Sequence, residues 1–179
     1  MPIYDDNPDM MAEQEQDRLA IETDERLAIF VYGTLRPGHG NSRLWQGLAT
    51  ARYDGKCFVL GYRLVGGGFP YAIPAPTAQT VGTLVYPHPE HEDEVRQQMD
   101  WLEGYPSHYT RVVTAVVTPD GYRLAWIYTP PEGKPFGLQR EVRTDSNGRF
   151  DWNMGTKARR DEQYVRAGWW DDEQHDDNF

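Results

Sequence analysis

The stretch Ile29-Phe30-Val31-Tyr32-Gly33-Thr34-Leu35-Arg36-Pro37-Gly38 sets the organisation of this chain. Its first half belongs to a short apolar run that begins at Leu27 and is rich in β-branched and aromatic residues. Such a run predicts a buried strand. The strand pattern stops abruptly at Gly33, and a loop follows in which Gly38 and Gly40 disfavour regular secondary structure.

Beyond the loop, Leu44, Trp45 and Leu48 recur at helical spacing, and Asn41 or Ser42 is placed to cap that helix. A strand, a glycine-rich loop and a helix in this order can direct backbone N–H groups towards an anion beside the helix N-terminus. A tight structural turn gives the same pattern. The residues alone leave both interpretations open.

A nucleotide-binding loop is the weaker interpretation of the same stretch. Gly33 and Gly38 have the spacing of the two glycines in a P-loop, but His39 and Gly40 stand where Lys and Ser or Thr are required. Without that Lys, the loop has no charge for a terminal phosphate.

Composition predicts one domain with acidic ends. The chain has 179 residues, of which 39% are hydrophobic and 13% aromatic, enough for one core. The formal net charge of −10 is uneven: residues 1–25 hold nine acids and one Arg, residues 161–179 hold seven acids and one Arg, and residues 26–160 hold 12 acids and 16 bases. A mildly basic body between acidic arms argues against nucleic acid as the main partner and fits a small anionic ligand.

Cysteine usage and hydropathy indicate the compartment. Cys57 is the only cysteine, so an intramolecular disulfide cannot form, and its apolar neighbours favour a core position over a nucleophile. Residues 1–11 are acidic and lack the apolar region of a signal peptide, and no apolar run reaches the length of a membrane span. We therefore expect a cytoplasmic protein that does not bind membranes. Its oligomeric state is not predicted.

The remaining patterns predict mostly short strands. The clearest helix covers residues 90–102, where Val95, Met99 and Leu102 share one face, and it ends before Gly104. The predicted strands are a bent or bulged pair within 51–65, short pieces at 69–74 and 80–86, and a hairpin of 109–118 with 122–128. These elements predict an α+β fold with a small mixed sheet or barrel.

The chain divides into three predicted regions. Residues 1–25 form an acidic arm with too few apolar residues to offset the entropy of ordering it. Residues 26–130 form the folded domain. Residues 131–179 form an irregular extension with an acidic tail.

Glu103 is the best candidate for a catalytic group. It closes the predicted helix, where the negative end of the helix dipole disfavours its charge, and burial would raise its pKa towards the range of an acid/base at neutral pH. An ordinary solvated Glu is the alternative. His88 and His91 lie three residues apart, but no Cys joins them and HExxH is missing, so no metal site is predicted.

Several short motifs in unbroken order resemble the γ-glutamylcyclotransferase-like family, which includes AIG2-like proteins and γ-glutamylamine cyclotransferases. The motifs are the loop stretch 30–38, Gly68-Phe69-Pro70-Tyr71, Val81-Gly82-Thr83-Leu84-Val85-Tyr86, Asp100-Trp101-Leu102-Glu103-Gly104, Tyr109-Thr110-Arg111 and Trp126-Ile127-Tyr128. Each motif alone is weak, whereas their combination over residues 27–129 is specific.

The resemblance implies a small β-barrel with flanking helices and with the loop at the mouth of a pocket. The family reaction converts a γ-glutamyl amine or dipeptide into 5-oxoproline and a free amine, without a metal or a cofactor. The substrate's own α-amine attacks its γ-carbonyl, which requires orientation more than nucleophile activation. By its place in the motif, Glu103 is expected to move the protons. The expected substrate-binding residues are Tyr32, Gly33, Thr34, Leu35, Tyr109 and Tyr128.

A non-catalytic relative is the alternative, one that binds a small acidic metabolite or a protein partner. The presence of both the loop and Glu103 favours the enzyme. The amine half of the substrate is not predicted, because variable loops would bind it.

Overall fold

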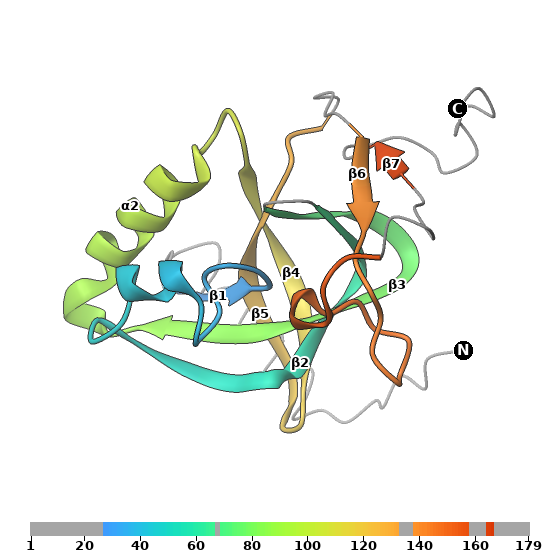
Figure 1. Cartoon of the computed structure of the whole chain (residues 1–179). Coiled ribbons are helices and arrows are strands. Elements are labelled where there is room, and N and C mark those ends of the chain that lie inside the picture. The colour runs from blue at the N-terminus through green and yellow to red at the C-terminus, as the bar shows by residue number, and fades with distance from the viewer. Residues whose placement is uncertain (1–26, 67–68, 133–137, 158–163, 167–179) are drawn as a thin grey trace.

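The computed structural model describes residues 27–66, 69–132, 138–157 and 164–166, and Figure 1 shows how its elements are arranged. The strands are β1 (Ala28–Val31), β2 (Ala49–Gly66), β3 (Pro70–Pro87), β4 (Thr110–Thr118), β5 (Gly121–Thr129), β6 (Leu138–Glu141) and β7 (Tyr164–Arg166). The helices are the α-helix α2 (Glu92–Glu103) and the 3-10 helices η1 (Gly40–Leu44), η2 (Pro89–His91) and η3 (Trp152–Met154).

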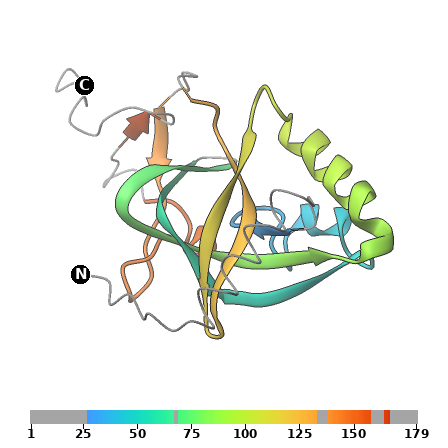
Figure 2. The same ribbon diagram turned by 180° about the vertical axis from the view of Figure 1, so that it is seen from behind.

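A closed mixed barrel of five strands forms the body of the protein. Neighbouring strands pair in the order β3-β1-β5-β4-β2, and β2 pairs with β3 to close the ring. β1 runs parallel to β5, and the other pairs in the ring are antiparallel. Figures 1 and 2 show α2 on one side of the barrel and β6 on the other. The predicted α+β barrel with flanking helices is therefore confirmed.

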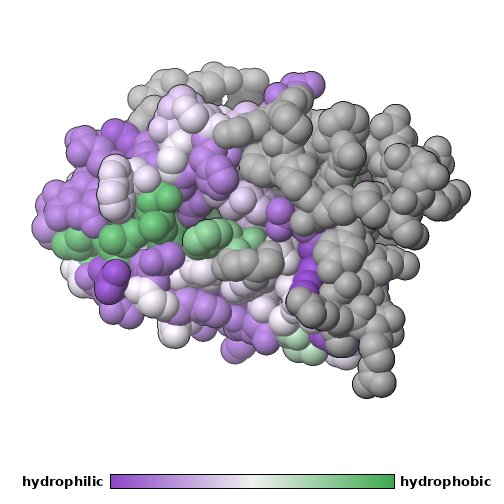
Figure 3. Space-filling view, turned by 45° about the horizontal axis from the view of Figure 1, so that its top comes forward, coloured by the Kyte–Doolittle hydropathy of each residue, from purple (hydrophilic) through white to green (hydrophobic). Residues whose placement is uncertain are grey.

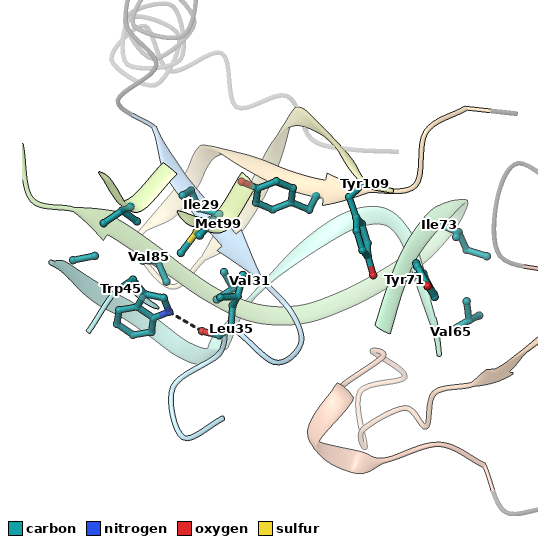
Figure 4. Packing of buried hydrophobic residues seen from close by; sticks show 13 residues of the cluster. Ile29, Val31, Leu35, Trp45, Val65, Tyr71, Ile73, Val85, Met99 and Tyr109 are labelled. Carbon is teal, nitrogen blue, oxygen red and sulfur yellow. Dashed lines mark hydrogen bonds between the residues drawn. The ribbon is translucent and has the colours of Figure 1, made fainter. Parts of the chain in front are cut away.

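β1 is buried on both faces, which explains its uninterrupted apolar sequence. Ile29 and Val31 belong to one cluster of buried side chains, and Ala28 and Phe30 belong to a second cluster. Successive side chains of a strand point to opposite faces, so a strand between two cores has no polar face. Figure 4 shows the first cluster around Ile29 and Val31.

The two longest strands correct the predicted division of residues 51–86. The expected strand pair within 51–65 is the single strand β2, and the pieces at 69–74 and 80–86 are one strand, β3. The pairing of β2 with β3 shifts register between Arg52 and Cys57 and between Leu60 and Tyr62. Glycines at positive φ, Gly55 and Gly61, lie within these irregularities, so they mark bulges in a continuous strand and not its ends.

The helix expected after the loop is also different in the structure. It is the short 3-10 helix η1, and His39 stands at its N-cap without a side-chain capping bond. The predicted caps, Asn41 and Ser42, therefore lie inside the element. Gly47 takes a φ of 79°, and the chain enters β2 at Ala49, which leaves no room for a longer helix.

α2 confirms the clearest sequence pattern. Val95 and Met99 are buried on its inner face, and Gly104 ends it in the left-handed conformation with a φ of 63°. It begins at Glu92, two residues later than predicted, because the preceding residues form η2.

Figure 3 shows one outer face of the molecule, where hydrophilic side chains predominate and a hydrophobic strip runs between them.

The remaining strands follow the barrel closely. The hairpin of β4 and β5 turns at residues 119–120, as predicted. In the described part of the extension, β6 pairs with β2, and Val142 is fully buried in the second cluster. The sequence did not indicate β6. The predicted boundaries at 25 and 130 stay predictions, and residues 1–25 lie outside the described part.

Candidate functional site

A cavity of about 130 Å³ opens between the end of β1, the loop that follows it and the C-terminal end of α2. All seven residues that the sequence singled out line this cavity: Tyr32, Gly33, Thr34, Leu35, Glu103, Tyr109 and Tyr128. They come from four separate parts of the chain. The fold therefore brings the predicted set together, while the role of each residue remains a proposal.

Gly33, Thr34 and Leu35 line one wall of the cavity. Among the described residues, no backbone carbonyl accepts a hydrogen bond from the N–H groups of Gly33, Thr34 or Leu35. Adjacent N–H groups without partners attract anions and developing negative charge. N–H groups of this kind, where they face a cavity, suit a carboxylate or an oxyanion.

Three contacts fix the conformation of the same loop. The Arg36 N–H donates to the Gly33 carbonyl at 3.0 Å, which closes a turn. The buried Trp45 indole N–H donates to the Leu35 carbonyl at 2.8 Å, the dashed line in Figure 4. The Asn41 side-chain amide donates to the Thr34 hydroxyl at 2.9 Å. The donors of the loop are thus held in place before any ligand binds.

Glu103 contributes the carboxyl group of the cavity. It is the last residue of α2, and burial raises its pKa from the ordinary 4.5 to about 7. Desolvation penalises the charged form of a carboxyl group. Burial accounts for this pKa, whereas the sequence had suggested the helix dipole as a further cause. A carboxyl group with this pKa can both accept and donate a proton near neutral pH.

The tyrosine hydroxyls around the cavity donate to other protein groups. The Tyr32 hydroxyl donates to the Tyr128 carbonyl at 2.6 Å, and the Tyr109 hydroxyl donates to the Pro70 carbonyl at 2.8 Å. Burial raises the pKa of Tyr32, Tyr109 and Tyr128, and the Glu103 charge raises it further. These hydroxyls stay protonated at neutral pH, so they shape the cavity without titrating.

An ion pair joins α2 to the barrel beside the cavity. The Tyr128 hydroxyl donates to Asp100 at 2.5 Å, and Arg111 Nε donates to the same carboxylate oxygen at 3.1 Å. The Arg111 guanidinium also lies 4.7 Å from the Tyr105 ring centroid and 4.8 Å from that of Trp126. Asp100, the nearest acidic neighbour of Glu103 on α2, is therefore already paired.

The sequence missed several residues of the cavity wall. Asn41 had been assigned to helix capping, Leu102 to helix packing and a family motif, Phe69 and Pro70 only to a family motif, and His108 to nothing. The side chains of Tyr71, His108 and Tyr109 form an aromatic group, in which Tyr71 and Tyr109 stack at 5.3 Å. The motifs 68–71 and 100–104 were the signals that pointed to this wall.

The described part of the chain holds no candidate metal site, no candidate membrane-spanning helix and no reactive cysteine. No group of three or more His, Cys, Asp or Glu side chains there could hold a metal ion. No helix found there combines the length and the apolar character that crossing a membrane requires. Cys57 is buried, and burial raises the pKa of its thiol to about 12, as expected of an unreactive core residue.

A comparison with protein families gives a match over most of the chain. The sequence model of the family described as gamma-glutamyl cyclotransferase, AIG2-like matches residues 29–153. A comparison with curated protein sequences finds no significant match.

Solved structures with a similar chain path include an AIG2-like protein from Mus musculus, with 20% identity and a TM-score of 0.47 over 70% of this chain and 95% of that chain. A protein from Arabidopsis thaliana has 16% identity and a TM-score of 0.47 over 71% and 76% of the two chains. A gamma-glutamyl cyclotransferase has 13% identity and a TM-score of 0.48 over 65% and 71%. The family match covers most of the chain, including the loop and Glu103, and the chain therefore belongs to the gamma-glutamyl cyclotransferase, AIG2-like family.

Proposed function

We propose that the protein cyclises the γ-glutamyl group of a γ-glutamyl amine or dipeptide to 5-oxoproline and releases the free amine. The observation that carries the proposal is the Glu103 carboxyl group, which burial holds at a pKa of about 7 in a cavity whose tyrosine hydroxyls donate elsewhere. The family assignment supports the same reaction class.

In the proposed reaction, the Glu103 carboxylate first takes a proton from the α-ammonium group of the substrate. The resulting amine attacks the γ-carbonyl carbon and closes a five-membered ring, and the carbonyl oxygen becomes an oxyanion. The C–N bond of the γ-amide then breaks, and Glu103 returns its proton to the leaving nitrogen. The ring nitrogen loses one further proton as it becomes an amide. The departing amine takes up that proton and leaves as an ammonium ion.

The loop amides supply the electrostatic part of this proposal. The N–H groups of Gly33, Thr34 and Leu35 would hold either the α-carboxylate of the substrate or the oxyanion. Donors that are fixed before the reaction stabilise developing charge without a reorganisation cost. The hydrogen bonds from Trp45 to the Leu35 carbonyl and from Asn41 to the Thr34 hydroxyl support this role, because they restrain the loop that carries these N–H groups.

Tyr32, Tyr109 and Tyr128 would bind the glutamyl chain through their rings. Their hydroxyl hydrogens donate to other protein groups, so the parts left for a ligand are the aromatic faces and edges. An intramolecular reaction gains most from a wall that holds the chain folded on itself, because orientation supplies much of the barrier reduction.

The decisive experiment is a screen of γ-glutamyl amines and γ-glutamyl dipeptides for release of 5-oxoproline, with the Glu103→Gln variant as the control. Release by the wild type and its loss in the variant would support the proposal. If no member of the panel turns over but a γ-glutamyl compound still binds, the protein is the non-catalytic binding relative. We also propose a cytoplasmic location, which the single, buried Cys57 favours over an oxidising compartment.

A further inference from the structure

The loop of residues 33–38 contacts the segment of residues 150–154, which lies more than 100 positions later in the chain. Arg36 is 2% exposed, and its Nη1 donates to Asp151 Oδ1 at 2.7 Å. Its Nη2 lies 3.9 Å from Asp54 Oδ1. An ion pair shielded from water is stronger than an exposed pair, so this contact ties the two segments firmly.

A second contact joins the end of the loop and the later segment, between His39 and Asn153. His39 Nε2 and Asn153 Oδ1 are hydrogen-bonded at 2.7 Å. Thus both Arg36 and His39, which flank Pro37 and Gly38, pair with residues of η3 or its N-cap. Two contacts at this spacing restrict rotation of the loop as well as its translation.

The later segment is anchored on the barrel independently of the loop. The Phe150 N–H donates to the Gln79 carbonyl at 2.9 Å, and the Val81 N–H donates to the Phe150 carbonyl at 2.8 Å. Asp151 Oδ1 also accepts from the Asn153 N–H at 2.9 Å, which orients the carboxylate. The Asp151 carboxylate is therefore a fixed point against which Arg36 is held.

We propose that Asp151 is a positioning residue, which acts through Arg36 to hold the N–H groups of Gly33, Thr34 and Leu35 at the cavity wall. The link is direct, because the Arg36 N–H closes the turn on the Gly33 carbonyl, so a shift of Arg36 rotates the peptide groups between them. The consequence for ligand binding rests on the proposed function. The mechanical link does not, so the two can be tested separately.

Hydrogen exchange measured by NMR tests the mechanical link without any substrate. Two protons report on the loop: the Arg36 amide and the Trp45 indole N–H, which donates to the Leu35 carbonyl. In Asp151→Asn, both should exchange about 10-fold faster or more, as expected when a hydrogen bond between charged groups is weakened. Glu141→Gln is the matched control, because it weakens an ion pair of similar length, Glu141 with Lys157 at 2.8 Å, that does not involve the loop.

Kinetics tests the consequence for the site. Asp151→Asn should lower kcat/KM for 5-oxoproline release by about 10- to 100-fold, the cost of misplacing reacting groups by a fraction of a bond length. The pH at which kcat/KM reaches half its maximum should stay the same, because Glu103 lies on α2 and keeps its surroundings. A loss in kcat alone would assign the amides to the oxyanion, and a rise in KM alone would assign them to the carboxylate.

Because loss of a partner for a buried charge can unfold a protein, the thermal midpoint is measured for each variant. If Asp151→Asn does not fold, Asn153→Ala, which removes the more exposed contact to His39, takes its place. Exchange rates equal to those of Glu141→Gln would overturn the mechanical link. Faster exchange with unchanged kcat/KM would overturn the positioning role. If the wild type turns over no substrate, the proposed function fails, and the exchange rates still decide the link.

Discussion

The hydroxyl of Tyr32 donates to the carbonyl of Tyr128 at 2.6 Å and joins two residues 96 positions apart. Tyr32 follows β1, and Tyr128 lies near the end of β5. The Tyr128 hydroxyl in turn donates to Asp100 on α2. The strand that leads into the loop and the helix that carries Glu103 are therefore connected through one tyrosine beside the cavity.

The Tyr128→Phe variant tests this connection. It removes the hydroxyl that donates to Asp100 but keeps the ring at the cavity wall. We expect the free energy of unfolding to fall by about 1.5–3 kcal/mol, the range for a hydrogen bond to a charged group. Chemical denaturation measures the change. Tyr122→Phe, at an exposed position of the β4–β5 hairpin, is the control and should be neutral. Equal stability of both variants would show that the bond to Asp100 contributes nothing.

Replacement of the carboxyl group tests the proposed acid/base. Glu103→Gln should fold, bind a γ-glutamyl compound and lose on the order of 10²–10⁴ in kcat, the usual contribution of a positioned acid/base. Glu103→Asp should also lose activity, because the shorter side chain withdraws the carboxylate from the reacting nitrogen. Steady-state kinetics and calorimetric binding separate the two effects. Glu94→Gln, on the exposed side of α2, is the control.

Asp100 offers the sharpest contrast to Glu103. Its carboxylate accepts from Arg111 and Tyr128, so Asp100→Asn should lower stability and disturb the cavity, but it should leave the pH profile of the reaction unchanged. If Asp100→Asn abolishes 5-oxoproline release while Glu103→Gln keeps near wild-type release, the assignment of the acid/base is wrong.

The pKa of about 7 at Glu103 predicts the pH dependence of activity. The ionised carboxylate is the form that accepts the first proton. Therefore kcat/KM should fall as the pH drops through about 7, with a slope that reports one ionisation. A pH profile of kcat/KM measures this directly. An acid limb centred near pH 4.5 would mean that Glu103 is solvated in the free enzyme.

The same pKa predicts the pH dependence of stability. Stability and activity should change in opposite directions as the pH rises. The folded chain holds the Glu103 proton more tightly than the unfolded chain, so wild-type stability should fall as the pH rises from about 4.5 to 7. Below that window, both states are protonated and the penalty vanishes. Glu103→Gln should match the wild type at pH 4 and exceed it at pH 8 by at most about 3 kcal/mol, less where solvent reaches the carboxylate. Denaturant titrations at both pH values measure the gap.

The sequence predicted the elements whose causes are local. The α2 pattern, its Gly104 end and the β4–β5 turn depend on residues within a few positions of one another, and the structure has them. β2 was divided wrongly because a glycine such as Gly55 is equally compatible with a turn and with a bulge, and β3 was divided wrongly at Pro74. Only the pairing with a distant strand decides between a turn and a bulge.

In the candidate site too, local motifs could be identified from the sequence, whereas contacts between distant residues could not. Residues in motifs, such as Gly33 and Glu103, could be placed from the sequence and line the cavity. His108 lines it too, but it lies outside any motif. The pairing of Arg36 with Asp151 spans 115 positions, and no local pattern marks two residues that meet only when the barrel closes.

Gly33 both packs against Pro70 and lines the cavity. A Cβ atom at this position would lie 2.2 Å from Pro70 Cγ, far inside van der Waals contact, and both residues line the cavity. A side chain at position 33 would therefore collide with Pro70, so either the loop or the start of β3 must move.

We therefore expect Gly33→Ala and Gly33→Val to weaken binding of a γ-glutamyl compound, with Val the stronger, because the displaced loop carries the proposed donors with it. Calorimetric binding and thermal midpoints measure both effects. Gly40→Ala is the control, since a Cβ atom there meets nothing within 4 Å. Thr34→Ala loses only the hydroxyl that accepts from Asn41 and should be milder, because the proposed ligand contact comes from its backbone. If Gly33→Ala lowers the midpoint while the folded protein binds as tightly as Gly40→Ala, the loop is a structural turn and holds no ligand.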